Sequence, residues 1–436
     1  MYLAGRRLVC RPVVRHSTHD DAPEAKATMP AVCSKQLAAA EPTSVLPRRP
    51  IGRRAASKLD GPRSSCRRGK IESHSVMTSL SLDATKQVKV DQGRPPSTEA
   101  VTVLSVGYLV LDVVTGTKMV GRSAGGTAGN VAANLAWLGQ RTGLLARIGD
   151  DDAGEFLRND LSGAGVDTTH IHRSADVETP ILIQRLTDSG PKYLFSCPVC
   201  NYKFASHRPA TREQAEEAAA SAPRILFVDR ASKASLNLMA KVRAQGGIVM
   251  FEPNGPGRQS LTAEAIALAD ILKVSEDRVL SLGGLLATTP QQQVQVRTRG
   301  AQGLDFRIGD GAWHTRRARR VRVSDSAGAG DWVTAGLLAH LAEDPRLTYR
   351  NISDSLSLAQ ALAAMSCAFV GARGMNSSLT WNHARGLLDG PTTVSWDNVE
   401  RSDTPVPTHM EISTQNCSAC GNRHATPPRT SRTAPL

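Results

Sequence analysis

Short apolar runs alternate with amphipathic segments along the chain from about residue 101 onward. The run VTVLSVG at 101–107 has the length and composition of a buried strand, and residues 130–138 place apolar side chains at helical spacing before Gly139. The alternation continues to two helices expected at 328–343 and 352–372. Strands that alternate with helices predict an α/β fold with a mostly parallel central sheet flanked by helices on both faces.

One stretch departs from this alternation. Residues 179–196 read as an exposed hairpin, with the turn Asp188-Ser189-Gly190-Pro191 between two arms. We expect a small β lid around 112–125 and 179–200, attached to an α/β domain over 98–385. The segments on either side, 1–97 and 386–436, lack sustained periodicity. The first is therefore expected to be a disordered basic extension and the second a polar C-terminal tail.

The positive charge of the chain is concentrated at its start. The formal net charge is +13, and the first 97 residues hold 18 lysines and arginines against 8 acidic residues. The excess positive charge therefore belongs to the N-terminal extension. This distribution argues against nucleic-acid binding by the folded body. Translation from Met77 and an Arg- and Ser-rich organellar targeting segment are left open for residues 1–76. Without a secretory signal or a long apolar run, we expect a cytoplasmic protein that is not membrane-bound.

The segment Asp325-Ser326-Ala327-Gly328-Ala329-Gly330-Asp331 directly precedes the helical run WVTAGLLAHL. Small residues at a helix start let a ligand approach the backbone, and the free N–H groups there bind anions. An aspartate at the same point would repel an anion. Its presence there is therefore unexpected unless the site uses it as a proton acceptor. A phosphate over the amides and a hydroxyl beside Asp331 would together give phosphoryl transfer, although a plain helix cap is the alternative.

A second glycine-rich segment, Gly125-Gly126-Thr127-Ala128-Gly129-Asn130, opens the helix expected at 130–138. Glycines again permit close approach, and the Asn130 amide can donate to and accept from hydroxyl groups. The segment matches neither a Walker A loop nor the G-x-G-x-x-G dinucleotide pattern. A glycine-rich turn with an asparagine cap is the alternative interpretation.

Taken together, these segments resemble the two signatures of the PfkB, or ribokinase-like, carbohydrate kinase family. Gly-Gly-x-x-x-Asn at 125–130 is followed by Arg-Ile-Gly-Asp-Asp-Asp-Ala-Gly at 147–154, and the second signature lies at 325–331. Between them, Thr298-Arg299-Gly300-Ala301-Gln302-Gly303 resembles the nucleotide loop of the family. The resemblance covers about residues 100–385 and implies a ribokinase-like fold with ATP-dependent phosphorylation of a sugar hydroxyl.

The resemblance also implies a role for each matching residue. Asp331 would be the catalytic base, with the amides of Gly328, Ala329 and Gly330 as the anion hole. The other implied roles are sugar binding by Asp112, Gly125, Gly126 and Asn130; nucleotide binding by Ser275, Thr298, Gly300 and Gly303; and monovalent cation binding, K⁺ for example, by Asp325, the Ala327 carbonyl, Gly374 and Ser378. Mg²⁺ would arrive with ATP.

One departure from the family concerns metal handling. The usual Asn-x-x-Glu after the strand near residue 274 reads Ser275-Glu276-Asp277-Arg278 here, so Glu276 or Asp277 would have to serve in its place. This departure supports an alternative: a catalytically weak sugar- or nucleotide-binding protein that acts through a partner. A nucleoside acceptor and a homodimer formed through the lid also stay open.

The cysteines form two Cys-x-x-Cys pairs, Cys197 with Cys200 and Cys417 with Cys420. In a chain without a secretory signal, such pairs indicate metal or redox chemistry before structural disulfides. Two tight turns that each aim two thiolates at one ion would make a four-sulfur Zn²⁺ site, if the C-terminal tail folds back onto the lid. His424 is a substitute ligand in this hypothesis. Chance pairs of reduced cysteines are the alternative.

Overall fold

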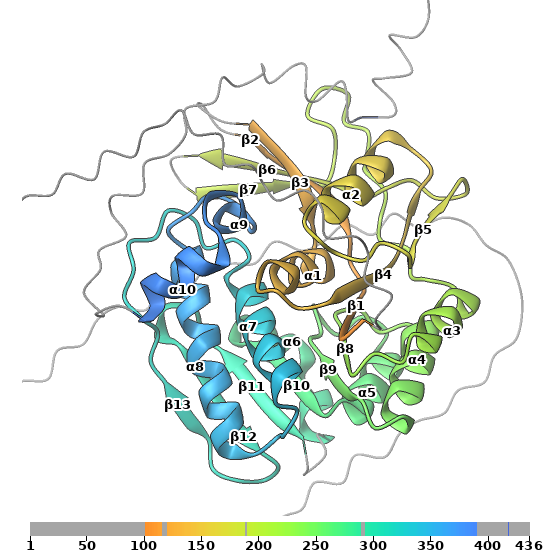
Figure 1. Ribbon diagram of the computed structural model, residues 1–436. Coiled ribbons are helices and arrows are strands. Elements are labelled where there is room, and N and C mark those ends of the chain that lie inside the picture. Colours follow the sequence, from red (N-terminus) through yellow and green to blue (C-terminus); the bar gives the residue numbers. More distant parts are fainter. Residues whose placement is uncertain (1–100, 116–119, 188–189, 289–292, 390–416, 418–436) are drawn as a thin grey trace, which may run out of the picture. The chain divides into compact units, whose positions relative to one another are not determined.

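Two β-sheets, of nine and four strands, organise the computed structural model, which describes residues 101–115, 120–187, 190–288, 293–389 and Cys417 (Figure 1). All of these residues belong to one compact unit, Val88–Leu436. Among the described residues, no helix is both long enough and apolar enough to cross a membrane.

The nine-stranded sheet is parallel except at one edge, where β12 and β13 run antiparallel to their neighbours. Its strands, in spatial order, are β13 (His314–Arg316), β12 (Leu304–Ile308), β11 (Val294–Thr298), β10 (Ile271–Ser275), β9 (Ile248–Phe251), β8 (Ile225–Val228), β1 (Val103–Val106), β4 (Thr142–Gly149) and β5 (Ile171–Ser174). In the central strands, the side chains on both faces of the sheet are buried, as expected for a sheet covered on both faces.

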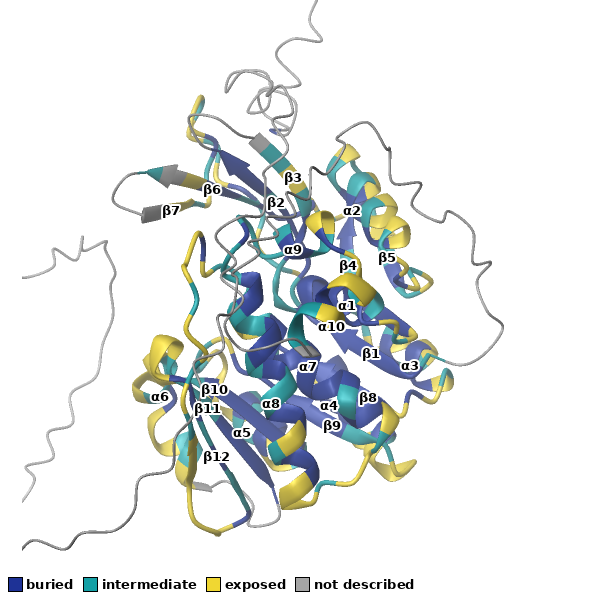
Figure 2. Cartoon of the chain, turned by 60° about the vertical axis from the view of Figure 1, so that its left-hand side comes forward, coloured by how far each residue is buried: buried dark blue, intermediate teal, exposed yellow. Residues whose placement is uncertain are grey.

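Helices cover both faces of this sheet, and the buried strands lie between them (Figure 2). One face packs against α1 (Thr127–Trp137), α7 (Ala329–Glu343), α8 (Tyr349–Ser366), α9 (Gly374–Ser378) and α10 (Trp381–Asp389). The other face packs against α3 (Arg212–Ala220), α4 (Lys233–Ala244), α5 (Gln259–Leu268) and α6 (Glu276–Leu282). In the first layer, the Trp137 and Trp332 rings meet edge to face with centroids 5.3 Å apart, which joins α1 to α7.

Strand β1 is the point at which the order of the sheet reverses. It pairs with β4 on one side and with β8 on the other, so the connections diverge from its carboxyl end. In open α/β sheets, ligands bind outside the carboxyl ends of the strands at such a switch point. The chain leaves β1 through Gly107 and enters the smaller sheet directly, so that sheet begins beside the expected binding region.

The four-stranded sheet is the small β lid that the sequence predicts. Its order is β3 (Val120–Gly125), β2 (Val110–Thr115), β6 (Ile181–Thr187) and β7 (Gly190–Leu194). Leu111 and Val113 of β2 are buried in one apolar cluster with Leu157 and Leu161 of α2 (Asp152–Gly163). Because side chains alternate along a strand, Asp112 faces away from this cluster.

The predicted helix at 352–372 is wrong at both ends, because α8 spans Tyr349–Ser366. Thr348 caps its start by accepting a hydrogen bond from the Asn351 N–H. After Ser366, the Cys367 carbonyl accepts hydrogen bonds from the N–H groups of Ser324 and Asp325, at 2.7 and 3.2 Å. Tertiary hydrogen bonds therefore replace the next helical turn. The predictions for residues 1–97 and for most of 386–436 lie outside the described residues.

Candidate active site

The start of α7 is shaped by glycine. Gly328 precedes the helix with φ of 73°, and a Cβ atom on this residue would lie 2.6 Å from the Ala372 Cβ. Both the left-handed backbone and the close approach of residue 372 exclude a larger residue. No described side chain caps this helix, and its first helical hydrogen bond runs from the Trp332 N–H to the Gly328 carbonyl at 2.9 Å. The turn thus presents N–H groups that lack helical acceptors, as an anion site requires.

One of the three amides predicted for the anion hole is already engaged. The Ala329 N–H donates to the Ser326 carbonyl at 3.3 Å, which is long for a backbone hydrogen bond. A bond this weak can be exchanged for a charged phosphate oxygen at small cost. The amides of Gly328 and Gly330 lie on either side of it.

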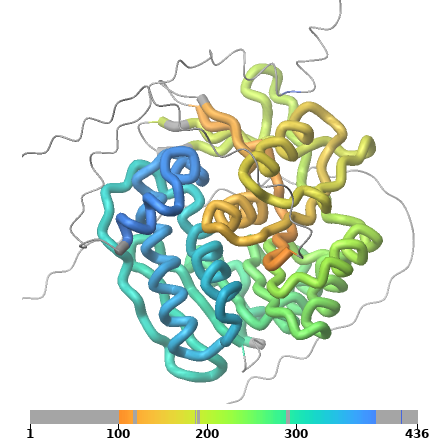
Figure 3. Tube along the Cα trace, in the orientation of Figure 1, coloured from red at the N-terminus to blue at the C-terminus, as the bar shows by residue number. Residues whose placement is uncertain are grey.

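Asp331 lies in the first turn of α7 and contacts the second glycine-rich segment of the sequence. The Asn130 Nδ2 donates to the Asp331 Oδ2 at 2.7 Å, although 201 residues separate the two in the chain. Asn130 comes from α1, which lies beside α7 (Figure 3). The structure therefore brings together the two residues for which the family resemblance predicts the roles of base and sugar ligand.

Three buried polar side chains underlie this helix start, and sequence reasoning missed all of them. Lys273 of β10 forms an ion pair with Glu252, which follows β9, with 2.5 Å between Nζ and Oε1. The Thr334 hydroxyl of α7 donates to the Glu252 Oε2 at 2.7 Å. The Lys273 Nζ also lies 3.8 Å from the place that a Cβ on Gly330 would occupy, so a positive charge supports the predicted anion hole. The lysine inside the otherwise apolar strand DILKVS was the available signal.

The electrostatic surroundings raise the pKa of Asp331 from its usual value of 3.8 to about 7. Burial of the carboxyl group is the main cause, and the negative charge of Glu252 is the second. The hydrogen bond from Asn130 and the charge of Lys273 act in the opposite direction. A carboxyl group with this pKa can accept a proton near neutral pH and hold it in a later step.

The sugar-binding residues predicted from the sequence surround the junction of lid and sheet. Gly126 precedes α1 with φ of 83°, and a Cβ there would lie 2.4 Å from the Tyr108 carbonyl oxygen. A Cβ on Gly125 would lie 2.6 Å from the Asp112 Cβ. The two glycines are therefore needed for the backbone to pass between Tyr108 and Asp112.

Two oxygens in this region are buried without a hydrogen-bond partner among the described residues, namely Asp112 Oδ1 and Asn130 Oδ1. Buried acceptors of this kind are costly unless a ligand or water donates to them. Burial, with like-charge repulsion from Asp325 as the second cause, raises the pKa of Asp112 to about 6. The two oxygens are therefore candidate acceptors for hydroxyl groups, and Asn130 also contacts Asp331.

Beside these acceptors, an aromatic and charged cluster lies at the end of β8. The Tyr108 N–H donates to the Asp229 Oδ1 at 2.9 Å, and the Arg230 guanidinium lies 5.0 Å from the centre of the Tyr108 ring. The His207 ring meets Tyr108 edge to face at 5.8 Å. Burial lowers the pKa of His207 to about 4, so the imidazole is neutral at physiological pH. Sequence reasoning also missed this cluster, although Asp229 ends a buried strand run.

The residues predicted to bind the nucleotide lie at the carboxyl ends of neighbouring strands. Ser275 ends β10, Thr298 ends β11, and the two are paired in the register of the sheet. Gly300 and Gly303 belong to the loop after β11, where the Gly303 N–H donates to the Gly300 carbonyl at 3.0 Å. The Ser275 hydroxyl is buried without a partner among the described residues. All four therefore lie in the half of the sheet that extends from β1 through β8, β9 and β10.

Direct contacts connect only some of the residues that are predicted to bind a monovalent cation. The Asp325 Oδ1 accepts from the Ala327 N–H at 3.0 Å, and its Oδ2 accepts from the Gly371 N–H at 2.9 Å. Gly374 and Ser378 lie at the two ends of α9, where the Ser378 hydroxyl donates to the Gly374 carbonyl at 2.9 Å. In the described structure, the carboxylate of Asp325 thus joins the 325–328 turn to the segment that precedes α9.

Asp325 also contacts the lid. The Gln184 Nε2 of β6 donates to the Asp325 Oδ2 at 3.4 Å. On the other side of the lid, Arg373 forms an ion pair with Asp160 and donates to the Ala124 carbonyl at 3.2 Å. Lid strands and the loops before α7 and α9 are therefore connected by polar contacts around the site.

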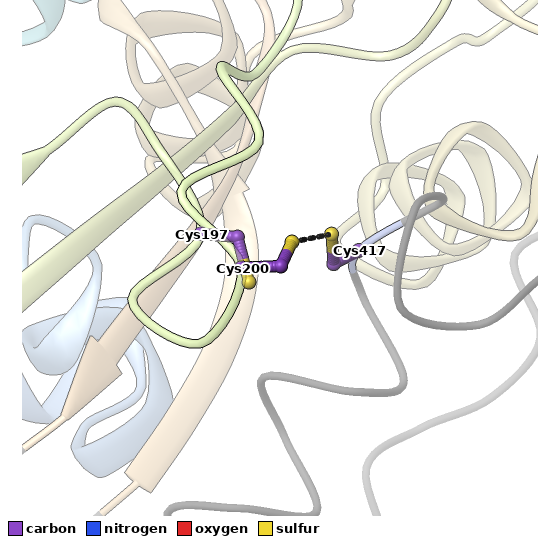
Figure 4. Close-up of side chains that lie close together, drawn as sticks. All are labelled: Cys197, Cys200 and Cys417. Carbon is purple, nitrogen blue, oxygen red and sulfur yellow. Dashed lines mark hydrogen bonds between the residues drawn. The ribbon is translucent and has the colours of Figure 1, made fainter. Parts of the chain in front are cut away.

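The predicted zinc residues divide into two groups. Cys197, Cys200 and Cys417 lie together, with all sulfur atoms within 4.8 Å of one another (Figure 4). Cys420 and His424 lie outside the described residues.

The chain is similar in sequence to proteins of known function. The sequence profile of the pfkB family carbohydrate kinases matches residues 103–379. The chain is 31% identical over 268 residues to aminoimidazole riboside kinase of Salmonella typhimurium, covering 57% of this chain and 83% of that protein. It is 27% identical over 269 residues to fructokinase of Escherichia coli, covering 57% of this chain and 87% of that protein.

Two solved structures show the same architecture. The crystal structure of aminoimidazole riboside kinase from Salmonella enterica, complexed with aminoimidazole riboside and an ATP analog, matches with a TM-score of 0.54 and 25% identity over 66% of this chain and 99% of that chain. Fructokinase with bound ATP from Xylella fastidiosa matches with a TM-score of 0.56 and 22% identity, over 66% of this chain and 97% of that chain. The predicted ribokinase-like fold is confirmed by these matches.

Proposed function

The chain belongs to the PfkB family of carbohydrate kinases and is an ATP-dependent kinase, and from this premise we propose that it phosphorylates a hydroxyl group of a ribose- or fructose-like sugar or a sugar acid. The contact between Asp331 and Asn130 carries this proposal. It joins a proton acceptor at a helix start to a side chain whose remaining oxygen is free for a hydroxyl group.

In the proposed reaction, Asp331 is the base. The acceptor hydroxyl loses its proton to the Asp331 carboxylate while its oxygen bonds to the γ-phosphorus of ATP. The bond between that phosphorus and the β,γ-bridging oxygen breaks, and ADP leaves with the electron pair. The pKa of about 7 supports this role, because proton acceptors work best when their pKa lies near the operating pH.

The amides of Gly328, Ala329 and Gly330 are proposed to hold the phosphoryl oxygens during transfer. The N-terminal end of α7 and the buried charge of Lys273 both favour negative charge at this point. The hole is built from backbone that the turn holds before the substrate arrives, and only the long Ala329 N–H bond to the Ser326 carbonyl has to be exchanged on binding. Preorganised donors of this kind stabilise the transition state without reorganising during the reaction.

ATP is proposed to lie along the carboxyl ends of β10 and β11, over Ser275, Thr298, Gly300 and Gly303. Magnesium bound to its phosphates would neutralise their charge. Oxygen ligands suit this ion, and the buried, unpartnered Ser275 hydroxyl with the exposed carboxylates of Glu276 and Asp277 supplies them at the end of β10. We also propose that K⁺ binds near Asp325, the Ala327 carbonyl, Gly374 and Ser378.

The sugar is proposed to lie between the lid and the sheet, with Asp112, Gly125, Gly126 and Asn130 around it. The unpartnered oxygens of Asp112 and Asn130 support this placement, because each can accept a hydrogen bond from a sugar hydroxyl. The Tyr108 and His207 rings favour a second candidate acceptor, a nucleoside-like riboside with a ring that can stack. A cytoplasmic location stays part of the proposal.

A homodimer formed through the lid is also proposed. The lid strand β7 is an edge strand, and two large apolar side chains at this edge are exposed, Tyr193 by 50% and Phe195 by 58%. An exposed apolar edge strand favours pairing with another chain. Light scattering of the purified protein, compared with a Phe195→Lys variant, tests the assembly. A wild type that stays monomeric would remove it from the proposal.

A coupled ATP-turnover assay tests the proposed reaction. The acceptor panel contains ribose, fructose, a sugar acid, aminoimidazole riboside and adenosine, and each is measured with wild type and Asp331→Asn. We expect turnover of at least one acceptor, and a fall of about 10²- to 10⁴-fold in kcat for Asp331→Asn, the usual contribution of a general base. Sugar binding by the wild type without turnover would favour the alternative of a weakly catalytic binding protein.

A further inference from the structure

The chain after lid strand β7 forms a tight turn that orients two thiols. The Cys197 N–H donates to the Tyr202 carbonyl at 2.8 Å, and the Asn201 N–H donates to the Cys197 carbonyl at 2.8 Å. Asn201 adopts a left-handed conformation with φ of 59°, which asparagine tolerates better than most residues. This backbone places Cys197 and Cys200 on the inner side of one short loop.

A third thiol comes from the far end of the chain. Cys417 is 2% exposed and belongs to the same apolar cluster as the fully buried Cys197. Its sulfur lies 3.7 Å from the sulfur of Cys200, although 217 residues separate them in the sequence (Figure 4). A loop that supports the lid and a tail residue therefore meet at their sulfur atoms.

The separation of the sulfurs distinguishes between two chemistries. Bonded disulfide sulfurs lie about 2.05 Å apart, and a disulfide would join only two of the three thiols. Sulfurs at the corners of a tetrahedron around Zn²⁺, each at a Zn–S distance of about 2.3 Å, lie about 3.8 Å apart. The observed 3.7 Å and the clustering of all three sulfurs within 4.8 Å match the tetrahedron.

We propose that Cys197, Cys200 and Cys417 bind one structural Zn²⁺ ion as thiolates. Structural zinc sites are four-coordinate, so one further ligand completes the tetrahedron. The sequence predicts Cys420 for this position, and it lies outside the described residues. The site fastens Cys417 to the loop after β7 and is independent of the kinase proposal, because none of its ligands belongs to the candidate active site.

Metal analysis of the full chain tests the site. The protein is purified without metal-affinity chromatography and under reducing conditions, and zinc is measured by mass spectrometry against protein concentration. We expect about one zinc ion per chain, as one tetrahedral site holds. Cys197→Ser and Cys417→Ser should lose most of it. Cys367→Ser is the matched control and should keep it, because Cys367 is outside the sulfur cluster and its thiol donates to the Ala363 carbonyl.

A second measurement does not depend on the folding of variants. Wild-type protein is stripped with a chelator under reducing conditions and reloaded with Co²⁺. A tetrahedral thiolate site gives strong visible bands and near-ultraviolet sulfur-to-cobalt charge-transfer bands, and added Zn²⁺ should abolish both. Three results would overturn the proposal: purified protein without zinc, an octahedral cobalt spectrum, or a Cys200–Cys417 disulfide in peptides mapped without reduction.

Discussion

The ion pair between Lys273 and Glu252 is the feature whose removal we expect to be most informative. The side chains are only 1% and 7% exposed, and their charged atoms lie 2.5 Å apart. Lys273→Met would leave the Glu252 carboxylate buried without its counter-charge. Removing one partner of a buried pair costs about 3–5 kcal/mol, so we expect the free energy of unfolding to fall by that order. Urea denaturation of the full chain at pH 8 measures the change.

The double variant Lys273→Met/Glu252→Gln is the matched control. It leaves no unpaired charge, and the glutamine oxygen can still accept the hydrogen bond from Thr334. We expect it to regain most of the lost stability, because uncharged replacements of buried pairs are often near neutral. The reasoning is refuted if the single variant is as stable as wild type, or if the double variant is no more stable than the single one.

Two further substitutions test the sugar site and the anion hole. Asp112→Asn should raise the KM for the sugar by about 10- to 100-fold, the value of a hydrogen bond to a charged group, and leave the KM for ATP unchanged in steady-state kinetics. An equal rise in both KM values would count against sugar binding by Asp112. Gly328→Ala should lower the free energy of unfolding by about 1–3 kcal/mol and reduce kcat, because of its positive φ and the contact with Ala372. Gly163→Ala, where a Cβ meets nothing within 4 Å, is the control, and equal losses in both variants would contradict the argument.

The sequence predicts the local parts of the fold and site better than the long-range ones. The glycine turns at 125–126 and 328–330 are recognisable because helix starts that bind ligands need small residues. The parallel sheet follows from alternating apolar runs. The end of α8 could not be predicted, since it depends on hydrogen bonds from residues 324 and 325 to the Cys367 carbonyl.

The buried polar side chains under Asp331 could not be recognised for a related reason. Glu252, Lys273 and Thr334 are far apart in the chain and meet only when β9 pairs with β10 and α7 packs across them. Their types are visible in the sequence, but their pairing is not. Polar residues at or near the carboxyl ends of apolar strands, such as Asp229 and Glu252, were a usable signal, because such ends line the ligand site of α/β sheets.

The cysteines show the same contrast between local and long-range information. Each Cys-x-x-Cys spacing is local, so both turns were recognisable. Whether Cys417 returns to the lid depends on the path of the chain after α10. In the structure Cys417 lies 3.7 Å from Cys200, sulfur to sulfur, which agrees with the predicted return of the tail. The metal itself stays a prediction.

The pH dependence of kcat tests most directly whether Asp331 removes the proton from the acceptor. Only the ionised carboxylate can accept that proton, and its pKa is raised to about 7, so kcat should rise with pH and level off above it. We predict an acid limb with an apparent pKa near 7 when the acceptor and ATP are saturating. A kcat that stays constant from about pH 5 upward, where an ordinary aspartate is already ionised, would contradict the account.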